Sequence, residues 1–123
     1  KITDHFGQPV TVLVNNAGDI IKNATVDRME EDLWDKVIST NLKGIFLCCK
    51  YAIPGMKTRE NARIINMSSI SARSGGGPGS AHYAASKGGV ESFTRALAKE
   101  LGVDQSTVHR NLQAALKNLR KFF

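Results

Sequence analysis

The sequence predicts an α/β fold in which two parallel strands alternate with two long helices. Short apolar runs at residues 11–15 and 63–67 have the length and composition of buried strands. Apolar residues at helical spacing follow each run, over about 29–57 and 81–101. The order strand, helix, strand, helix is typical of α/β proteins with a parallel sheet. We therefore expect a βαβα fragment with one further helix after it.

Each predicted strand ends in small polar residues. The first, Thr11–Asn15, is rich in β-branched residues and runs into Asn15-Asn16-Ala17-Gly18. The second, Arg63–Met67, is followed by Ser68 and Ser69. Ligand sites in open α/β sheets lie beyond the carboxyl ends of the strands. These polar residues are therefore candidates for a functional site.

Local signals mark where the helices begin and end. Asp27 with Glu30 resembles a capping box before the first long helix, and Pro54-Gly55 marks its approaching end. Gly102 is the expected stop of the second helix. The first ten residues resemble the tail of a helix, and a last helix is expected from about Gln105. The two long helices are predicted from apolar residues at helical spacing. These are Leu33, Val37, Ile38, Leu42, Ile45, Phe46, Cys49 and Ile53 in the first helix, and Val90, Phe93, Leu97 and Leu101 in the second.

The sheet is expected to have one covered face and one open face. Right-handed crossovers in one winding direction place both connecting helices on the same side. An apolar sheet face in water favours association. The other face is open unless the C-terminal helix or a second copy of the chain covers it, so we predict an oligomer or a non-standard packing.

Length and composition limit the choices further. A chain of 123 residues suits one core and holds only about half of a full dinucleotide-binding fold. No apolar run reaches the ~18 residues of a membrane span. Adjacent Cys48 and Cys49 are expected to be small core residues of a reducing compartment. The predicted location is cytoplasmic, and no metal site is predicted.

Four polar elements carry a recognisable chemistry. A tyrosine can exchange a proton near neutral pH only if its pKa falls from about 10. Lys87 lies one helical turn after Tyr83, where its positive charge favours the phenolate. Ser69 can orient a carbonyl group from the end of the second strand. Asn41 lies in mid-helix, where asparagine is not favoured, so a specific reason for it is expected.

In this order, Asn15-Asn16-Ala17-Gly18, Asn41, Ser69 and Tyr83-x-x-x-Lys87 resemble the catalytic set of the short-chain dehydrogenase/reductase family. The resemblance covers about residues 1–102 and implies a partial Rossmann-like fold. It also implies hydride transfer between NAD or NADP and a small carbonyl or alcohol substrate. Tyr83 is then the acid/base, Lys87 assists it, Ser69 orients the substrate and Asn41 holds a water in the proton relay. Asn16, Ala17, Gly18, Tyr83 and Lys87 are the implied cofactor contacts.

Other features of the sequence depart from that family. The Thr-Gly-x-x-x-Gly-x-Gly turn, with which that family binds the pyrophosphate of the cofactor, does not occur in this sequence. The Gly-rich loop over 74–80 stands where the family has its substrate loop and is no phosphate loop. Ser68 is an alternative to Ser69, because the loop to Tyr83 is slightly long. We therefore expect impaired turnover or none.

The C-terminal end supports a rival hypothesis. Residues from about 94 to 121 resemble a bacterial helix-turn-helix, with Gly102 in the turn and Val108 buried. The DNA bases would then be contacted by Gln105, Ser106, His109 and Arg110. The DNA phosphates would be contacted by Lys117, Arg120 and Lys121. A DNA complex should weaken steeply with salt and with Arg110→Ala.

The alternative is that residues 103–123 form a basic amphipathic helix that only covers core. Six basic residues against two acidic ones between 95 and 123 fit either a DNA-binding segment or a solvated helix face. The chain would then be a reductase-like fragment, 1–102, followed by an unrelated helix. With the helix-turn-helix resemblance, the chain instead looks like a splice of two families, as in a chimera. An inert folded scaffold is the third possibility.

Overall fold

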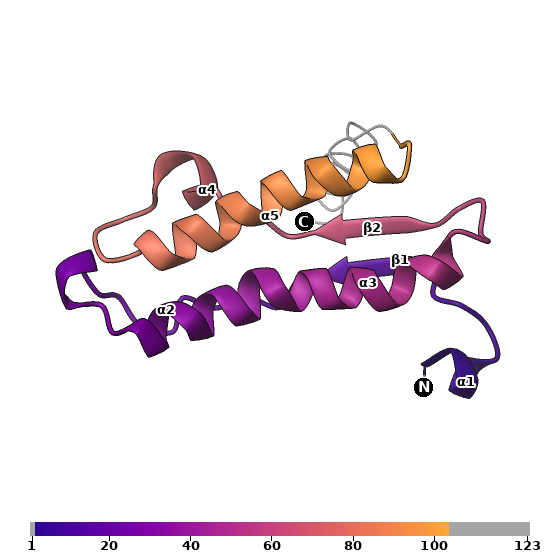
Figure 1. Ribbon diagram of the computed structural model, residues 1–123, viewed down its shortest axis with the longest axis horizontal. Coiled ribbons are helices and arrows are strands. Elements are labelled where there is room, and N and C mark those ends of the chain that lie inside the picture. The colour runs from indigo at the N-terminus through magenta and orange to yellow at the C-terminus, as the bar shows by residue number, and fades with distance from the viewer. Residues whose placement is uncertain (1, 104–123) are drawn as a thin grey trace, which may run out of the picture.

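The computed structural model describes residues 2–103, and these residues form a helix layer over a small sheet (Figure 1). Helix α1 (Ile2–Phe6) precedes strand β1 (Val12–Asn15). A continuous helical rod follows a short 3-10 turn and leads to strand β2 (Arg63–Asn66). The remaining elements are η1 (Val26–Arg28), α2 (Glu31–Ile38), η2 (Ser39–Lys43), α3 (Gly44–Met56), α4 (Ser71–Ser74) and α5 (Ala81–Glu100).

The two strands are parallel, as the alternation of strands and helices predicted. Their register pairs Val12 with Arg63 and Asn15 with Asn66. Both strands therefore end at the same edge of the sheet. The predicted α/β class and the partial Rossmann-like arrangement are confirmed.

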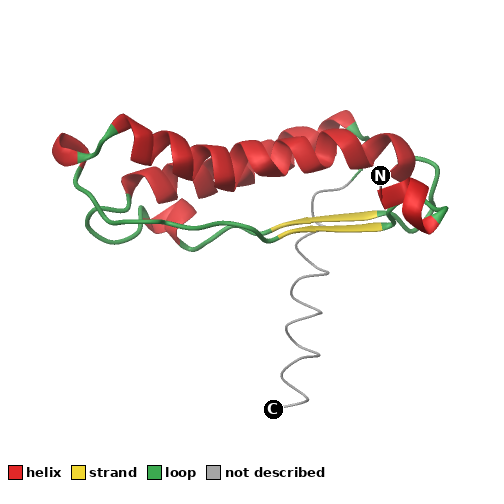
Figure 2. Ribbon diagram, turned by 90° about the horizontal axis from the view of Figure 1, so that it is seen from below, coloured by secondary structure: helices red, strands yellow, loops and turns green. Residues whose placement is uncertain are grey.

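Both long helices cover one face of the sheet, again as predicted. Figure 2 shows α3 and α5 in one layer and the two strands in the layer beneath it. The buried core between them consists of Ile45 and Cys49 from α3 with Val90 and Leu97 from α5. Leu13 and Ile64 pack against this core from the centre of each strand.

The opposite face of the sheet is apolar and open. Val12 and Val14 alternate with Leu13 along β1, and they are 53% and 55% exposed. This alternation is what a strand with one covered face requires. Within residues 2–103, these exposures agree with the open face that the crossovers predicted.

Two local predictions were wrong, and one short helix was not predicted. Helix α2 begins after Glu30 without any side-chain cap, and Asp27 lies in the separate turn η1, so no capping box forms. Cys48 is exposed, because only its neighbour Cys49 lies on the side of α3 that faces the core. The segment after β2 also contains the short helix α4, which ends at Gly75 in the left-handed conformation.

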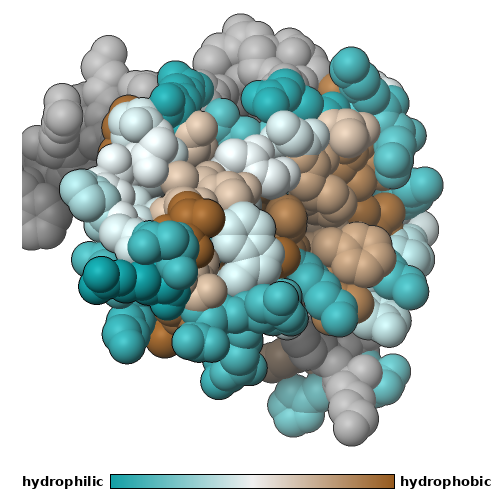
Figure 3. Space-filling view, turned by 60° about the vertical axis from the view of Figure 1, so that its left-hand side comes forward, coloured by the Kyte–Doolittle hydropathy of each residue, from teal (hydrophilic) through white to brown (hydrophobic). Residues whose placement is uncertain are grey.

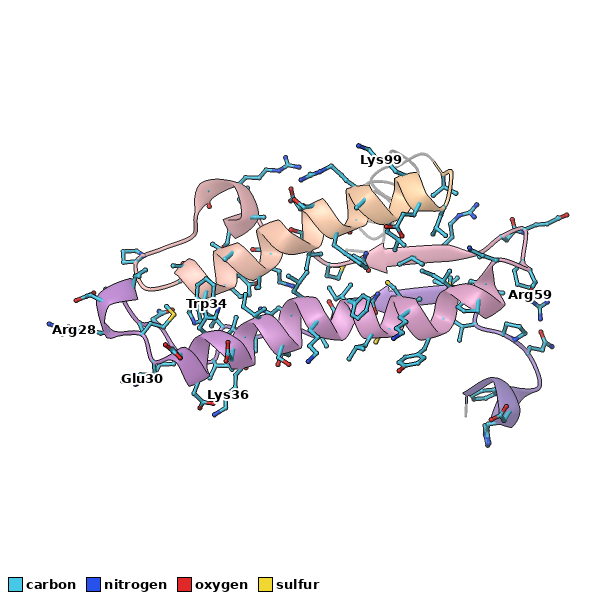
Figure 4. The ribbon with its side chains drawn as sticks, viewed as in Figure 1. Arg28, Glu30, Trp34, Lys36, Arg59 and Lys99 are labelled. Atoms are coloured by element: carbon cyan, nitrogen blue, oxygen red, sulfur yellow. The ribbon has the colours of Figure 1, made fainter. Side chains whose placement is uncertain are left out.

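Except for the buried Lys87, the charged side chains of the described residues lie on the outside of the helices. Figure 4 shows Arg28, Glu30 and Lys36 around the start of the helical rod, with Arg59 and Lys99 near the opposite end. Within the described residues, the helices include none that is long and apolar enough to cross a membrane.

Candidate active site

The carboxyl ends of β1 and β2 meet at one place and bring two loops together. Nδ2 of Asn15 donates a 2.8 Å hydrogen bond to Oδ1 of Asn66, directly across the last residue pair of the sheet. Nδ2 of Asn66 then donates to Oγ of Thr94 on α5 at 3.0 Å. The residues that follow each strand therefore begin from a fixed position beside α5.

Asn41 has a structural reason for its place in the middle of a helix. It lies in η2, a π-helical turn in which the Gly44 N–H bonds to the carbonyl of Ser39. Such turns insert one extra residue and are frequent at functional sites. The Asn41 side chain is fully buried and binds the backbone of Asp19 and Oγ of Ser86, each at 2.9 Å.

Lys87 is held inside the site by one hydrogen bond and by burial. Its Nζ donates to the carbonyl of Met67 at 2.8 Å, and the residue is 4% exposed. Burial lowers the pKa of Lys87, because the ammonium loses hydration that one carbonyl replaces only in part. The same nitrogen lies 5.8 Å from the centre of the Tyr83 ring. The spacing of one helical turn therefore does bring the two side chains together.

Gly18 makes the convergence of these groups possible. A Cβ at this position would lie 3.0 Å from Nζ of Lys87 and 3.2 Å from Oδ1 of Asn41. Any larger residue would have to displace one of the two side chains. Gly18, Asn41 and Lys87 thus come together from the loop after β1, the π turn and α5.

The two candidate serines have different surroundings. Ser69 Oγ accepts from the N–H of Ser71 at 3.2 Å and donates to Ser71 Oγ at 3.3 Å. Ser68 Oγ instead donates toward Glu91 and the Lys87 carbonyl on α5. Ser68 therefore points into the helix contact, and Ser69 belongs to the turn that leads into the pocket.

A pocket of about 440 Å³ lies beside these residues, between the loop after β1 and the loop before α5. Figure 3 shows this end of the molecule, where hydrophobic residues are surrounded by hydrophilic ones. Backbone N–H of Ala24 donates to the Gly79 carbonyl at 2.9 Å and joins the two loops. The pocket is lined by Gly18, Asp19, Ile20, Asn23, Ser71, Gly77, Pro78, Ser80 and Tyr83.

Sequence reasoning found some of this lining and missed the rest. Gly18, Tyr83 and the Gly-rich loop were expected there, whereas Asp19, Asn23 and Ser71 were not. Ser86 was also missed, although it links Asn41 to the backbone carbonyl of Tyr83 through a 2.7 Å hydrogen bond. Its position three residues after Tyr83, on the same helix face, was the available signal.

The remaining site predictions lie at the edge of the site or outside the described residues. Asn16 and Ala17 are exposed in the loop after β1, on the approach to Gly18. Gln105, Ser106, His109 and Arg110 fall outside residues 2–103, as do the predicted last helix and the phosphate contacts. DNA binding and the division at residue 102 therefore stay predictions.

Comparison with known proteins identifies the relatives of this chain. The family model described as short chain dehydrogenase matches residues 1–114. The chain is 43% identical over 109 residues to the 3-oxoacyl-(acyl-carrier-protein) reductase FabG of Staphylococcus aureus, covering 89% of this chain and 43% of that protein. The reductase of the same name from Thermotoga maritima is 45% identical over 101 residues, covering 82% of this chain and 40% of the relative.

The likeness extends further along the chain than expected. The Pseudomonas aeruginosa reductase of that name is 42% identical over 108 residues, covering 88% of this chain and 42% of the relative. The chain thus spans less than half the length of these curated relatives. The family match also runs past residue 102 and includes the four residues predicted to bind DNA bases. By its sequence, its parallel strands and the convergence of Gly18, Asn41 and Lys87, the chain belongs to the short-chain dehydrogenase family.

Proposed function

We propose that this chain carries the catalytic part of a nicotinamide-dependent oxidoreductase that interconverts a carbonyl and an alcohol. The observation that carries the proposal is the convergence of Gly18, Asn41 and Lys87 beside Tyr83. These residues meet at the carboxyl ends of two parallel strands, next to a pocket large enough for a small substrate.

Tyr83 is the proposed acid/base. A carbonyl oxygen that becomes an alcohol needs a proton, and the phenol of Tyr83 lines the pocket from which it would be delivered. As that proton leaves, negative charge develops on the tyrosine oxygen. The ammonium of Lys87, 5.8 Å from the ring centre, supplies a fixed positive charge for it.

Ser69 and Asn41 are proposed to position the other groups. Ser69 is hydrogen-bonded to Ser71, whose side chain lines the pocket, so this turn orients a carbonyl oxygen toward Tyr83. Asn41 is linked through Ser86 to the backbone of Tyr83. It therefore fixes the start of α5, and we assign it to the proton relay on the strength of the family resemblance.

The residues present fit the nicotinamide end of a dinucleotide. The missing side chain of Gly18 lets the loop after β1 approach Lys87 and Asn41 closely, since a Cβ there would lie 3.0 Å from Nζ of Lys87. Lys87 uses one N–H on Met67, and its other two can bind hydroxyl groups of a ribose. Asn16 and Ala17 are exposed beside this space. When bound, NADH or NADPH would supply the hydride for carbonyl reduction, and the oxidised form would accept it from an alcohol.

Turnover by these 123 residues alone is expected to be weak. The sequence contains no Gly-rich turn of the kind that binds a pyrophosphate at a helix N-terminus. The named relatives reduce 3-oxoacyl groups on a carrier protein, so a 3-oxoacyl thioester is the first substrate to test.

The test is a titration of NADH and NADPH with the purified chain, followed by nicotinamide fluorescence, and then an assay with acetoacetyl-CoA. Tyr83→Phe should abolish turnover and leave nucleotide binding and the melting curve almost unchanged. Tyr51→Phe is the matched control, because Tyr51 is 76% exposed on α3 and away from the pocket. Turnover that survives in the Tyr83 variant would refute the assignment.

We also propose that the chain forms a homo-oligomer. Val12 and Val14 leave an apolar strip on the open face of the sheet, and such a face favours association. A monomeric mass by light scattering, with a cooperative melt, would contradict this.

A further inference from the structure

The segment Asp19–Lys22 forms one wall of the pocket and is held in an uncommon conformation. Ile21 has φ of 62°, in the left-handed region that a β-branched residue rarely adopts. The N–H of Lys22 donates to the carbonyl of Ile20 at 2.7 Å, which closes a three-residue γ-turn around Ile21. Because this turn is unfavourable for isoleucine, the surrounding structure has to hold it.

His82 is the side chain that holds the turn. Its Nε2 lies 3.1 Å from the carbonyl oxygen of Ile20 and 3.1 Å from that of Lys22, one on each side of Ile21. Carbonyl oxygens only accept hydrogen bonds, so the hydrogen of the ring must be on Nε2. One buried N–H therefore fastens both ends of the strained residue.

The other ring nitrogen shows that this donor is the property in use. His82 is fully buried, and its Nδ1 has no hydrogen-bond partner among residues 2–103. A leucine of similar size would fill the same space without an unpaired Nδ1, but it would take the donor away from the carbonyls of Ile20 and Lys22. The histidine is unfavourable as mere packing, and its contribution is the hydrogen bond to the pocket wall.

The position of His82 connects this wall to the proposed acid/base. His82 directly precedes Tyr83 in the first turns of α5, so the clamp sets the spacing between the two sides of the pocket. At the opposite end of the segment, the Asn41 side chain holds both backbone groups of Asp19. The wall is thus fixed at its start by η2 and at its end by α5.

We propose that His82 is a positioning residue, which holds the wall Asp19–Lys22 against Tyr83 and thereby shapes the place where the carbonyl substrate binds. The identity of the occupant rests on the proposed function. The hydrogen bond from His82 Nε2 to the wall is independent of the proposed function, and it can be measured in the protein without ligand.

The first measurement uses the unmodified chain. Long-range ¹H–¹⁵N correlation spectra of the His82 ring should show the hydrogen on Nε2 and a bare Nδ1. Amide exchange of Lys22 should be slow, because its N–H lies in the turn that His82 holds. A ring whose only hydrogen lies on Nδ1 would overturn the proposal, whatever the variants do.

The second measurement compares three variants of His82. In His82→Gln the side-chain amide reaches the position of Nε2, whereas in His82→Asn it reaches only the position of Nδ1. His82→Leu keeps the volume and removes the donor. We expect Lys22 exchange to stay slow in the glutamine variant and to accelerate at least about tenfold in the other two. Equal exchange in the leucine variant and the unmodified chain would contradict the proposal.

A core amide separates loss of the clamp from loss of the fold. Leu97 lies in the buried core of α5, so its exchange reports global opening. The clamp predicts that Lys22 accelerates while Leu97 does not. If the amide exchange of Lys22 and of Leu97 accelerates together in every variant, the variants report loss of the fold. The tautomer of the His82 ring in the unmodified chain then decides whether His82 holds the wall.

Kinetics add a readout specific to substrate. With acetoacetyl-CoA and NADPH, His82→Leu should raise KM about tenfold and change kcat less than about threefold, because Tyr83 and Lys87 keep their own contacts. His82→Gln should restore KM. If the unmodified chain shows neither NADPH binding nor turnover, the proposed function fails, while the exchange and tautomer measurements still decide the role of His82.

Discussion

The side chain of Asn41 pairs with the backbone of Asp19 through both ends of its amide. Oδ1 accepts from the Asp19 N–H and Nδ2 donates to the Asp19 carbonyl, each at 2.9 Å. A neighbouring strand would make the same pair of bonds, and here a helical turn makes them instead. The loop after β1 is therefore fastened to the helix layer directly in front of Lys87.

Asn41→Ala should destabilise the fold by about 2–4 kcal/mol, because it removes buried hydrogen bonds to Asp19 and Ser86 and leaves their groups unpaired. Chemical denaturation followed by circular dichroism measures this change. Asn61→Ala is the control, since Asn61 is exposed before β2 and should change stability by less than about 0.5 kcal/mol. Equal effects of the two variants would disprove the buried clamp.

Gly18→Ala should disrupt the site more than the fold. The added methyl group lies 3.0 Å from Nζ of Lys87 and 3.2 Å from Oδ1 of Asn41, so these side chains must shift by a few tenths of an ångström. We expect nucleotide binding to weaken at least about tenfold, which is about 1.4 kcal/mol. Gly88→Ala serves as the control, because only one atom lies near its Cβ, at 3.9 Å, and alanine favours the helix. Unchanged NADPH binding by the Gly18 variant would count against the proposed cofactor position.

The burial of Lys87 predicts a pH dependence of stability. Its pKa is lowered on folding, so the unfolded chain binds more protons at pH values between that lowered pKa and the ordinary value of about 10.4. Stability gained from this group therefore rises with pH across that window. Below the lowered pKa the buried charge is a constant penalty, and above about 10.4 both states are neutral.

The difference in unfolding free energy between the unmodified chain and Lys87→Met isolates this effect. It should shift in favour of the unmodified chain as the pH rises from about 7 toward about 10. Lys50→Met is the matched control, because Lys50 is exposed on α3. A difference that stays constant with pH for Lys87→Met would mean that burial leaves its titration unchanged.

Ile21→Gly should stabilise the chain by about 1 kcal/mol, since glycine adopts positive φ without the strain that isoleucine carries there. The isoleucine side chain is 49% exposed, so little burial is lost. Val26→Gly is the comparison, because Val26 is 74% exposed and has no positive φ. It should be neutral or slightly destabilising, and thermal melts distinguish the two signs. If the Ile21→Gly variant melts below the parent chain, strain at this position is not the dominant effect.

Much of the fold was predictable because its signals are local. The period of apolar residues located β1, β2 and the two long helical segments, and the direction of crossover placed both helices on one face. The prediction of a capping box at Asp27 was wrong, because a matching pair of residue types does not specify the backbone angles at Glu30. The prediction that Cys48 lies in the core was also wrong, since two adjacent residues on a helix cannot both face one core.

The candidate site was predictable in part. Tyr83 and Lys87 lie one helical turn apart, so their spacing alone brings them together. Asn41 was suspect as a polar residue in mid-helix, but its π turn and its partners depend on a loop 22 residues earlier. Ser71 and Ser80 line the pocket because two loops are joined between Ala24 and Gly79, and no local pattern reports that contact.

Signals within the sequence are sufficient for the alternation of strands and helices, the family and the Tyr83–Lys87 pair, because periodicity and short spacings act within a few turns of the chain. Three-dimensional packing was needed to show that His82, 62 residues after Ile20, holds the strained turn at Ile21. It was also needed to show that a Cβ on Gly18 would lie 3.0 Å from Nζ of Lys87 and 3.2 Å from Oδ1 of Asn41. Such contacts arise where segments remote in sequence are packed against each other, and no local pattern of residues encodes them.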